Sequence, residues 1–284
     1  PQAAAIVAIG AHIDALATVF KYGIFSERAK LIHHNTAPGL IGIVFPVALG
    51  VTGSTTSFIA GLSERAAKTG LKKPWADMKK ARAEWDEDIA KALTPEAEPI
   101  QSQFVAHMIR KVLPKDGIVV VDAGNGGKHV RSYFRSHEPG TFMCIDDWAS
   151  VGGSFPIALG AKIARPDRPV LCASGDMGAM CNIGELETAV RENIPVVYVV
   201  FNDEGLGNER AFQNEHYGGR FYAVDYKNPD FGALAKVFGA HGEHVTKPSE
   251  LQGAIERAFA SGKPAIVDVM IDQKTLAPVV YKPQ

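Results

Sequence analysis

The sequence predicts an α/β protein whose larger part is a doubly wound parallel sheet. Continuous apolar runs of strand length recur from Gln101 onward, among them GIVVVD, PVLCAS, VVYVVF and AIVDVMI. Unbroken apolar runs of this kind are typical of parallel strands that are covered on both faces. Helical patterns separate the runs, as the connections between parallel strands require.

The composition is that of an ordinary soluble globular enzyme. Of the 284 residues, 46% are apolar and 21% are charged, and the net charge of −1 favours neither a nucleic acid nor an anionic membrane as partner. No apolar run is long enough to span a membrane, and the first residues carry no basic leader, so a cytoplasmic protein is expected. The three cysteines are too few for a disulfide framework. We expect Cys144, Cys172 and Cys181 to be small core residues in a reducing compartment.

The first hundred residues predict part of a domain and a linker. AAAIVAIGA and AKLIHH have the pattern of short strands, and SFIAGLSERAAKTG has that of a helix ending at Gly70. We therefore expect residues 1–75 to form the C-terminal part of a middle α/β domain whose beginning is not in the chain. For residues 76–100 we expect a linker helix and a loop, with one face of the helix packed through spaced apolar residues: Trp75, Met78, Trp85 and Ile89.

Residues 101–284 predict the main sheet domain. A helix in QFVAHMIRKVL and the strand GIVVVD are followed by the loop AGNGGKH, a strand near TFMCI and a helix in SFPIALGAKIA. Further helices are expected in IGELETAVREN, FGALAKVFG and ELQGAIERAFA. In sheets of this class, ligands bind beyond the carboxyl ends of the strands. The loops of interest are therefore 122–129, 146–156, 175–182 and 202–212.

Two carboxylates follow the strands on either side of one short crossover. Asn182 and Glu185 have the spacing of a capping pair that begins the connecting helix. Asp176 and Asp203 are then expected at the carboxyl ends of neighbouring strands, where hard oxygen ligands suit Mg²⁺ beside a diphosphate. The alternative is that the pairs Gly-Asp and Asn-Asp are ordinary turn dipeptides.

The glycine-rich stretch VVVDAGNGGKH matches no familiar phosphate motif. A dinucleotide fingerprint would need glycine where His129 stands, and a P-loop would need glycine where Asp122 stands. What remains is a glycine loop with Asn125 as a side-chain donor. The histidine pairs, His33-His34 and His241 with His244, lack zinc-protease spacing. We expect them at the surface or at strand edges.

Together these residues resemble a known family. The frame from Gly175-Asp176 to Asn202-Asp203, with GELETAVRENIPV inside it, resembles the cofactor motif of thiamine-diphosphate enzymes, of the acetolactate synthase, 2-oxo acid decarboxylase and 2-hydroxyacyl-CoA lyase type. The spacing of the two acids, 203 − 176 = 27, is that of the family's side-chain metal ligands. VVVDAGN, WASVGGSFPIALGAKIARPDRPV and KPAIVDVMID resemble further family segments in the same order. The resemblance covers the C-terminal half of such enzymes.

The resemblance implies a role for each matching residue. Asp176, Asp203 and the backbone carbonyl of Gly205 would hold Mg²⁺. The carbonyl of Ala149 would accept a hydrogen bond from the aminopyrimidine, with Val151 as the wedge beneath the bent cofactor. Asn208 and Phe212, four residues apart on one helix face, are expected to select the substrate, although Phe212 fits the core equally well. The full set of implied cofactor-binding residues is Asn125, Ala149, Val151, Gly175, Asp176, Met177, Gly178, Asp203, Gly205, Leu206 and Gly207.

Several positions depart from the family pattern. Met177 replaces the second glycine of the usual Gly-Asp-Gly, Asp203 stands where asparagine is commoner, and Val151 is a smaller wedge. Where flavin-binding relatives carry an arginine and acidic residues, this chain has His12, Asn35 and Ala37. We therefore expect no FAD.

The largest departure concerns the activating glutamate, which the family carries on an N-terminal, pyrimidine-binding domain. Glu185 and Glu187 lie on the helix between the metal ligands and are expected not to reach the pyrimidine. We therefore expect no catalytic residue in this chain, and a second polypeptide that carries the missing domain, in a dimer of heterodimers. The expected function is the diphosphate- and Mg²⁺-binding half of a lyase or carboligase acting on a 2-oxo acid or related acyl donor. A subunit of a 2-hydroxyacyl-CoA lyase or oxalyl-CoA-type decarboxylase, and a non-catalytic regulatory partner, remain the alternatives.

Overall fold

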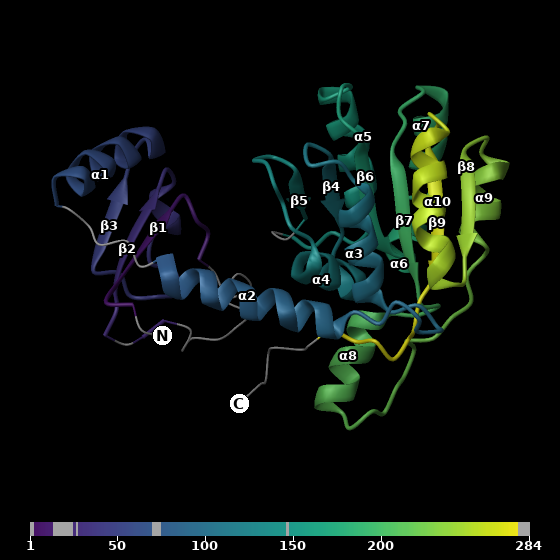
Figure 1. Cartoon of the computed structure of the whole chain (residues 1–284), viewed down its shortest axis with the longest axis horizontal. Coiled ribbons are helices and arrows are strands. Elements are labelled where there is room, and N and C mark those ends of the chain that lie inside the picture. The colour runs from purple at the N-terminus through teal and green to yellow at the C-terminus, as the bar shows by residue number, and fades with distance from the viewer. Residues whose placement is uncertain (1–2, 14–24, 27, 70–74, 146–147, 278–284) are drawn as a thin grey trace. The chain divides into compact units, whose positions relative to one another are not determined.

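The structure is a computed structural model, which describes residues 3–13, 25–26, 28–69, 75–145 and 148–277. The chain divides into two compact units, residues 1–82 and residues 83–278, and each is described by itself (Figure 1). The domain boundaries expected after residues 75 and 100 stay a prediction. Within the described ranges, no helix is both long enough and apolar enough to cross a membrane.

A three-stranded parallel sheet forms the centre of the smaller unit. Its order is β1–β2–β3, with the bounds Ala5–Ile9, Lys30–Asn35 and Leu49–Thr52. A 3-10 turn at Pro38–Leu40 lies between β2 and β3. The helix α1 (Thr55–Thr69) follows β3. The first two strands and the helix confirm the sequence prediction, while the expected helix end at Gly70 lies outside the described residues. The third strand was not predicted, because LGVT is short and contains a glycine, which weakens a strand pattern.

The expectation of exposed histidines in this unit is wrong. His33 and His34 are buried, with 1% and 0% of their surface exposed, because they lie on the central strand β2. His33 Nε2 lies 3.0 Å from the carbonyl of Ala11, and His34 Nε2 lies 3.1 Å from that of Gly53. These contacts satisfy one ring nitrogen of each histidine, as burial of a polar group requires.

The helix α2 (Trp75–Ala92) confirms the predicted linker helix. Its expected packing face is wrong for two residues, since Met78 and Trp85 are 57% and 52% exposed. Ile89 is partly buried. The helix is predominantly charged on the remaining surface, as a solvated helix is.

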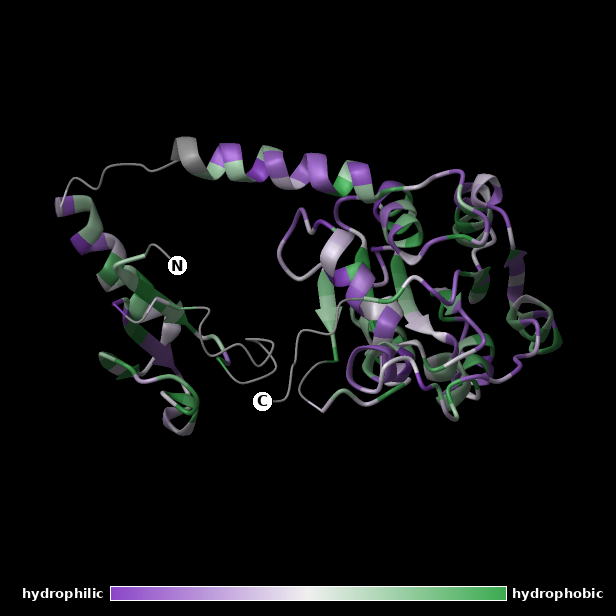
Figure 2. Cartoon of the chain, turned by 90° about the horizontal axis from the view of Figure 1, so that it is seen from below, coloured by the Kyte–Doolittle hydropathy of each residue, from purple (hydrophilic) through white to green (hydrophobic). Residues whose placement is uncertain are grey.

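Six parallel strands form the sheet of the larger unit, in the order β5–β4–β6–β7–β9–β8. Figure 2 shows strands at the centre of this unit as hydrophobic. In chain order, the bounds of β4 to β9 are Ile118–Val121, Phe142–Cys144, Val170–Gly175, Val197–Asn202, His241–Val245 and Ala265–Met270.

Helices cover both faces of this sheet, which confirms the doubly wound class. One core joins alternate strand residues to α3 (Ser102–Val112), α4 (Gly124–Tyr133) and α10 (Pro248–Ala260). The other core joins the intervening residues to α5 (Ser154–Ala164), α6 (Asp176–Cys181), α7 (Glu185–Arg191) and α9 (Phe231–Val237). Side chains of successive strand residues point to opposite faces, so unbroken apolar strands fill both cores at once.

The strand order places a topological switch between β4 and β6. From β4 the chain passes to β5 on one side and then returns to β6 on the other. Loops at the carboxyl ends of such a pair diverge and leave a crevice for a ligand. The stretches that follow β4 and β6 begin at Asp122 and Asp176, so both lie at this switch point.

Two of the expected loops are helical at this edge. The predicted loop AGNGGKH forms the first turns of α4, which begins at Gly124, and residues 176–181 form the short helix α6. Glycines hide the first of these helices from sequence patterns, because they have weak helix propensity. Gly127 is nevertheless required, since a Cβ atom there would lie 2.0 Å from the carbonyl oxygen of Asp122.

The expected capping pair is also absent from the helix between the two acids. Gly184 stands at the N-cap of α7, with no side-chain capping bond, so Asn182 and Glu185 do not form the predicted cap. Asn193 lies just beyond the end of α7, in a left-handed conformation with φ of 53°. Asparagine tolerates that conformation better than most residues.

The three cysteines do not share one environment. Cys172 is buried on β6, as expected, whereas Cys144 and Cys181 are exposed, so their predicted core position is wrong. Cys144 ends β5, the edge strand of the sheet, and Cys181 ends α6. An edge strand is paired on one side only, and Cys181 is the last residue of its short helix, so neither position is enclosed by the core.

Candidate functional site

The two carboxylates predicted to converge do lie at neighbouring strand ends. Asp176 follows β6 and Asp203 follows β7, and the two strands pair in parallel with Gly175 opposite Phe201. The side chains are only 1% and 7% exposed. The prediction that one short crossover connects adjacent strands is therefore confirmed.

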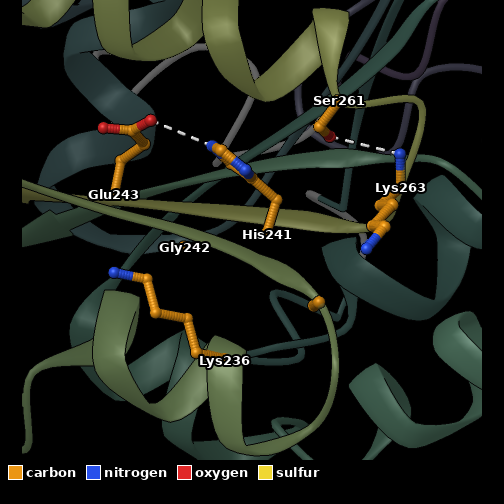
Figure 3. Close-up of a pocket in the computed structure, with 7 residues that line it drawn as sticks. Lys236, His241, Gly242, Glu243, Ser261 and Lys263 are labelled. Carbon is orange, nitrogen blue, oxygen red and sulfur yellow. Dashed lines mark hydrogen bonds and ion pairs between the residues drawn. The ribbon is translucent and has the colours of Figure 1, made fainter.

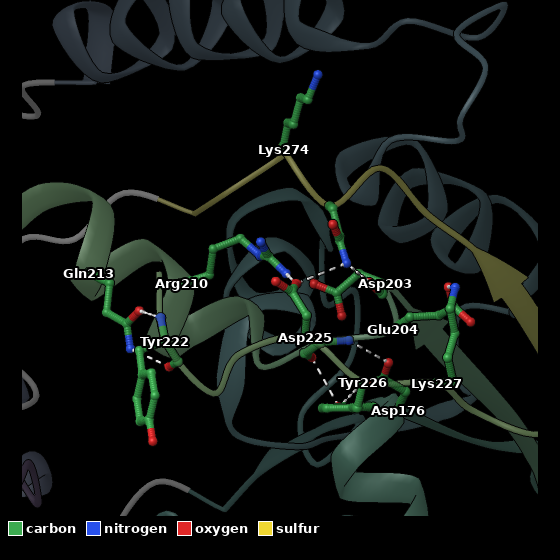
Figure 4. Close-up of polar contacts among 12 residues, drawn as sticks. Asp176, Asp203, Glu204, Arg210, Gln213, Tyr222, Asp225, Tyr226, Lys227 and Lys274 are labelled. Carbon is green, nitrogen blue, oxygen red and sulfur yellow. Dashed lines mark hydrogen bonds and ion pairs between the residues drawn. The ribbon is translucent and has the colours of Figure 1, made fainter. Parts of the chain in front are cut away.

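Four donors surround the carboxylate of Asp176, among them Tyr226, which Figure 4 shows beside it. Its Oδ1 accepts from the Met177 amide at 2.7 Å and from the Tyr226 hydroxyl at 2.8 Å. Its Oδ2 accepts from Asn228 Nδ2 at 2.8 Å and from the Gly205 amide at 3.3 Å. The Tyr226 hydroxyl also lies 3.0 Å from the Gly205 carbonyl. One hydroxyl oxygen thus reaches two of the three predicted metal ligands, so those ligands face a common point.

The electrostatics of the acid pair favour a cation. Burial, and then the neighbouring carboxylate of Asp176, raise the pKa of Asp203 to about 7, although the positive charge of Arg210 opposes the shift. Burial also raises the pKa of Asp176, against its hydrogen bonds. Two buried carboxylates oppose each other's ionisation, and an adjacent cation favours the ionised form of both. Arg210 directs its guanidinium to Asp225, so the arrangement suits a divalent metal ion between the two acids.

A short backbone pairing fixes the loop that follows Asp203. The Leu206 amide donates to the Val224 carbonyl at 2.8 Å, and the Tyr226 amide donates to the Glu204 carbonyl at 3.1 Å. Gly205 is required between them, because a Cβ atom there would lie 2.7 Å from the Val224 carbonyl oxygen. The carbonyl of Gly205 is thereby held beside Asp176.

Gly207 brings the start of α8 (Gly207–His216) against the acids. A Cβ atom at this position would lie 2.7 Å from Asp203 Oδ2 and 3.0 Å from the Cβ of Asn125. Glycine therefore allows α8, the metal loop and α4 to meet. Leu206, which immediately precedes α8, is partly buried.

Asp122 is a buried carboxylate that the sequence analysis did not single out as functional. It is 0% exposed and accepts hydrogen bonds from the Gly152 amide at 3.0 Å, from Ser154 Oγ at 2.7 Å and from Ser174 Oγ at 2.9 Å. These donors belong to the loop before α5, to α5 itself and to β6. Asp122 therefore holds three segments together at the topological switch, which a strand-terminal aspartate in a sequence does not reveal.

The loop before α5 holds Ala149 in an unusual backbone conformation and leaves Val151 exposed. Ala149 has φ of 47°, in the left-handed region that disfavours side chains, and Val151 is 51% exposed. Gly152, with φ of 85°, packs where a Cβ atom would be 2.7 Å from the Gly178 carbonyl. Strain of this kind persists only where the surroundings enforce it. The cofactor roles of Ala149 and Val151 stay a prediction, and residues 146–147 of the same predicted loop lie outside the described residues.

Asn125 is already engaged within the chain. Its Nδ2 donates to the Thr275 carbonyl at 3.0 Å, and its Oδ1 accepts from the Ala277 amide at 2.6 Å. An amide nitrogen carries two hydrogens, so the predicted contact of Asn125 with a diphosphate does not require either of these bonds to break. Gly175 is more open, since a Cβ atom there would meet no atom within 4 Å. Gly178 is buried on α6, where a Cβ atom would lie 2.2 Å from Ser174 Oγ.

The two predicted substrate residues both lie on α8. Asn208 is partly buried and accepts a hydrogen bond from Lys128 Nζ at 2.7 Å, which ties α8 to α4. Phe212 is also partly buried, and its ring lies 5.4 Å from that of His216. Their role in substrate selection stays a prediction.

A second set of polar residues extends the site away from Asp176. Asn228 also donates to Asn202 Oδ1 at 2.9 Å, and Asn202 donates to Asp268 Oδ1 at 3.0 Å. His244 Nδ1 lies 2.9 Å from Asp268 Oδ2. Asp268 is 0% exposed, and burial raises its pKa. No sequence pattern reveals this series of hydrogen bonds, because its members come from four separate segments.

Asp268 also belongs to a compact group with Asp230 and His244, whose ligand atoms all lie within 4.8 Å of one another. Hydrogen bonds account for this group. Asp230 Oδ1 caps α9 by accepting from the Ala233 amide at 2.8 Å, and both oxygens of Asp268 already accept hydrogen bonds. The prediction that His241 and His244 lie at a strand edge is confirmed, because β8 is the last strand of the sheet.

A separate cavity of about 460 Å³ lies beside β8 (Figure 3). Lys236, His241 and Lys263 line it, and His241 Nε2 lies 2.9 Å from Glu243 Oε1. His241 begins β8 and Lys263 precedes β9, so the cavity lies at the amino ends of these strands. It is therefore at the opposite edge of the sheet from Asp176 and Asp203.

The fold is a doubly wound α/β domain, and its buried acid pair lies at the carboxyl ends of the strands, where sheets of this class bind ligands. Residues 105–269 match the family described as "Thiamine pyrophosphate enzyme, C-terminal TPP binding domain". This match covers more than half of the chain, and the chain belongs to that family. The resemblance found in the sequence is thereby confirmed.

Several enzymes are similar to this chain over most of its length. The sulfoacetaldehyde acetyltransferase of Alcaligenes xylosoxydans xylosoxydans is 28% identical over 95% of this chain and 50% of its own length. A probable acetolactate synthase of Mycobacterium bovis is 31% identical over 90% of this chain and 47% of its own. A probable acetolactate synthase large subunit of Methanococcus aeolicus is 28% identical over 90% and 45%. The chain spans about half the length of these relatives.

Proposed function

We propose that this chain is the diphosphate- and Mg²⁺-binding half of a thiamine-diphosphate-dependent lyase or transferase that acts on a 2-oxo acid or a related acyl donor. One observation carries the proposal. The buried acids Asp176 and Asp203 lie at the carboxyl ends of adjacent strands, and Asp176 and the Gly205 carbonyl face a common point. A site of this kind, next to a topological switch, suits a metal-bridged diphosphate.

The residues at the site fit the proposed group. Asp176, Asp203 and the Gly205 carbonyl offer hard oxygen ligands, which Mg²⁺ prefers, and Mg²⁺ commonly completes its coordination with phosphate oxygens and water. The Tyr226 hydroxyl now lies on Asp176 and Gly205. A metal ion would take over both oxygens, so we expect this hydroxyl to withdraw when the metal binds.

Bound thiamine diphosphate supplies a carbon nucleophile that also serves as an electron sink. This chain's own residues bind and orient. Asp122 fixes the strained loop that carries Ala149, through the Gly152 amide and Ser154. The Ala149 carbonyl is proposed to accept a hydrogen bond from the aminopyrimidine, and Val151 to support the cofactor's bend. A rigid loop favours one orientation of the ligand, and correct orientation of the reacting groups lowers the barrier to reaction.

We propose that the pyrimidine side of the cofactor, with the activating glutamate, is bound by a domain outside these 284 residues, on the same polypeptide or a second one. The lengths of the relatives support this proposal, since they are about twice as long as this chain. The names of the relatives also support an acyl-transferring or acetolactate-forming reaction. Mass analysis of the purified complex would identify which polypeptide carries the second domain.

Calorimetry with thiamine diphosphate and Mg²⁺ tests the proposal. We expect the unaltered protein to bind the cofactor only with the metal, and Asp176→Ala and Asp203→Ala to lose that binding. Asp167→Ala is the matched control, because Asp167 is exposed and pairs with Arg165 outside the site. Unchanged cofactor affinity in both site variants would refute the assignment of the metal ligands.

A further inference from the structure

Lys128 is a half-buried cation whose hydrogen-bond partner is neutral. It lies on α4, and its Nζ donates to Asn208 Oδ1 on α8 at 2.7 Å. Within the part of the chain that the structure describes, its amine forms no ion pair with a carboxylate. Burial of an ammonium group is costly when no opposite charge accompanies it. The positive charge of the Lys128 amine is therefore not balanced by a bound carboxylate in the described part of the chain.

The surroundings strengthen this imbalance. Burial, and then the positive charge of Arg131, lower the pKa of Lys128, while Glu209 opposes the shift. Glu209 is exposed and accepts a hydrogen bond from Asn208 Nδ2 at 3.2 Å. The neutral amide thus stands between the amine and that carboxylate. An ammonium group has three donors, and Asn208 uses one of them.

Lys128 and its partner Asn208 lie on the two helices that begin at the candidate cofactor site. Lys128 follows Asn125 on the same helix, and Asn208 follows Gly207 on α8. Gly207 is the residue whose backbone packs directly against Asp203 Oδ2 and Asn125. The Lys128–Asn208 pair therefore joins the two helices that begin at the carboxyl edge of the sheet, beside the acids.

We propose that Lys128, positioned by Asn208, binds an anionic oxygen group of a ligand seated at this edge of the sheet. The proposal deepens the proposed function and rests on it. A compact ammonium charge suits a carboxylate, sulfonate or phosphate oxygen equally well. Two sources of that group fit the site, the diphosphate of the cofactor and the acidic group of a substrate.

The alternative is a purely structural role, in which Lys128 only ties α4 to α8. The two roles differ in one measurable respect. An anion that binds the amine stabilises its charged form and raises its pKa, whereas a structural bond between the helices does not respond to ligand. The state of the amine itself, rather than enzyme turnover, is therefore the decisive quantity.

The test is NMR of the complete protein after reductive ¹³C-methylation of its lysines. The signal of Lys128 is assigned by its loss in Lys128→Met. Lys236→Met is the matched control, because Lys236 lines the cavity at the opposite edge of the sheet. The protein is titrated first with thiamine diphosphate and Mg²⁺, and then, with both bound, with pyruvate as the acidic probe. Calorimetry follows cofactor binding in parallel.

We expect the Lys128 signal to shift and its pKa to rise by about one unit or more, while Lys236 stays unchanged. A shift with thiamine diphosphate identifies the diphosphate as the anion, and Lys128→Met should then weaken cofactor binding about tenfold. A shift that appears only with pyruvate identifies an acidic substrate. If the cofactor binds but the Lys128 signal responds to neither ligand, the inference about Lys128 is refuted and the proposed function is not. If no cofactor binds at all, the proposed function fails instead.

Discussion

Replacement of Asp203 by asparagine should stabilise the metal-free protein at neutral pH. Burial and Asp176 raise the pKa of Asp203 from 3.8 to about 7 in the folded chain. In the unfolded chain the carboxyl ionises at its ordinary pKa. Ionisation of Asp203 is therefore less favourable in the folded chain than in the unfolded chain, which lowers the free energy of unfolding. An asparagine of the same shape does not ionise and avoids this loss of stability.

The magnitude follows from the shift in pKa. A difference of 7 − 3.8 units, at 1.36 kcal/mol per unit, corresponds to about 4 kcal/mol at full ionisation. The cost is absent below pH 4, where the carboxyl is protonated in both states, and it is complete above pH 7. The free energy of unfolding of the metal-free protein should thus fall as pH rises from 4 to 7, and this fall should be smaller in Asp203→Asn.

Urea unfolding at pH 5 and pH 8, with a chelator present, measures this difference. We expect Asp203→Asn to be more stable than the unaltered protein at pH 8 by an amount of up to about 4 kcal/mol, and much less so at pH 5. Asp167→Asn, at an exposed position, is the control. Equal stability of the Asp203→Asn variant and the unaltered protein at pH 8 would contradict the electrostatic account of the acid pair.

Three further predictions concern other parts of the chain. Burial lowers the pKa of His129 to about 4, so stability should fall as pH drops from 6.5 towards 4, by roughly 3 kcal/mol in total; urea unfolding of His129→Leu should lack this fall. Asp268→Ala leaves Asn202 and His244 without their buried partner and should weaken Mn²⁺ binding about tenfold or more, measured by electron paramagnetic resonance; an unchanged affinity would exclude a positioning role. The visible absorbance spectrum of the purified protein should show no bound FAD, and a stoichiometric flavin spectrum would contradict that expectation.

The sequence predicted the parts of the site that are close together along the chain. The short crossover from Asp176 to Asp203 leaves little choice but adjacent parallel strands, and β6 and β7 are indeed neighbours. Unbroken apolar strands likewise required cover on both faces. Local pattern and chain length were sufficient for these conclusions.

Contacts between distant segments could not be predicted in the same way. Tyr226 and Asn228 reach Asp176 across about fifty residues of chain, through hydrogen bonds of 2.8 Å each. His33 and His34 have no local sequence feature that distinguishes a central strand from an edge strand. The order of strands in the sheet decides burial there, and sequence periodicity does not contain that order.

The most direct test of the central claim is pulsed electron paramagnetic resonance on the protein with Mn²⁺ in place of Mg²⁺ and thiamine diphosphate present. We expect ³¹P coupling from the diphosphate to a protein-bound Mn²⁺ ion, and loss of that signal in Asp176→Ala and Asp203→Ala. Mn²⁺ bound without ³¹P coupling, or coupling that persists in both variants, would contradict a metal-bridged diphosphate held by these two residues.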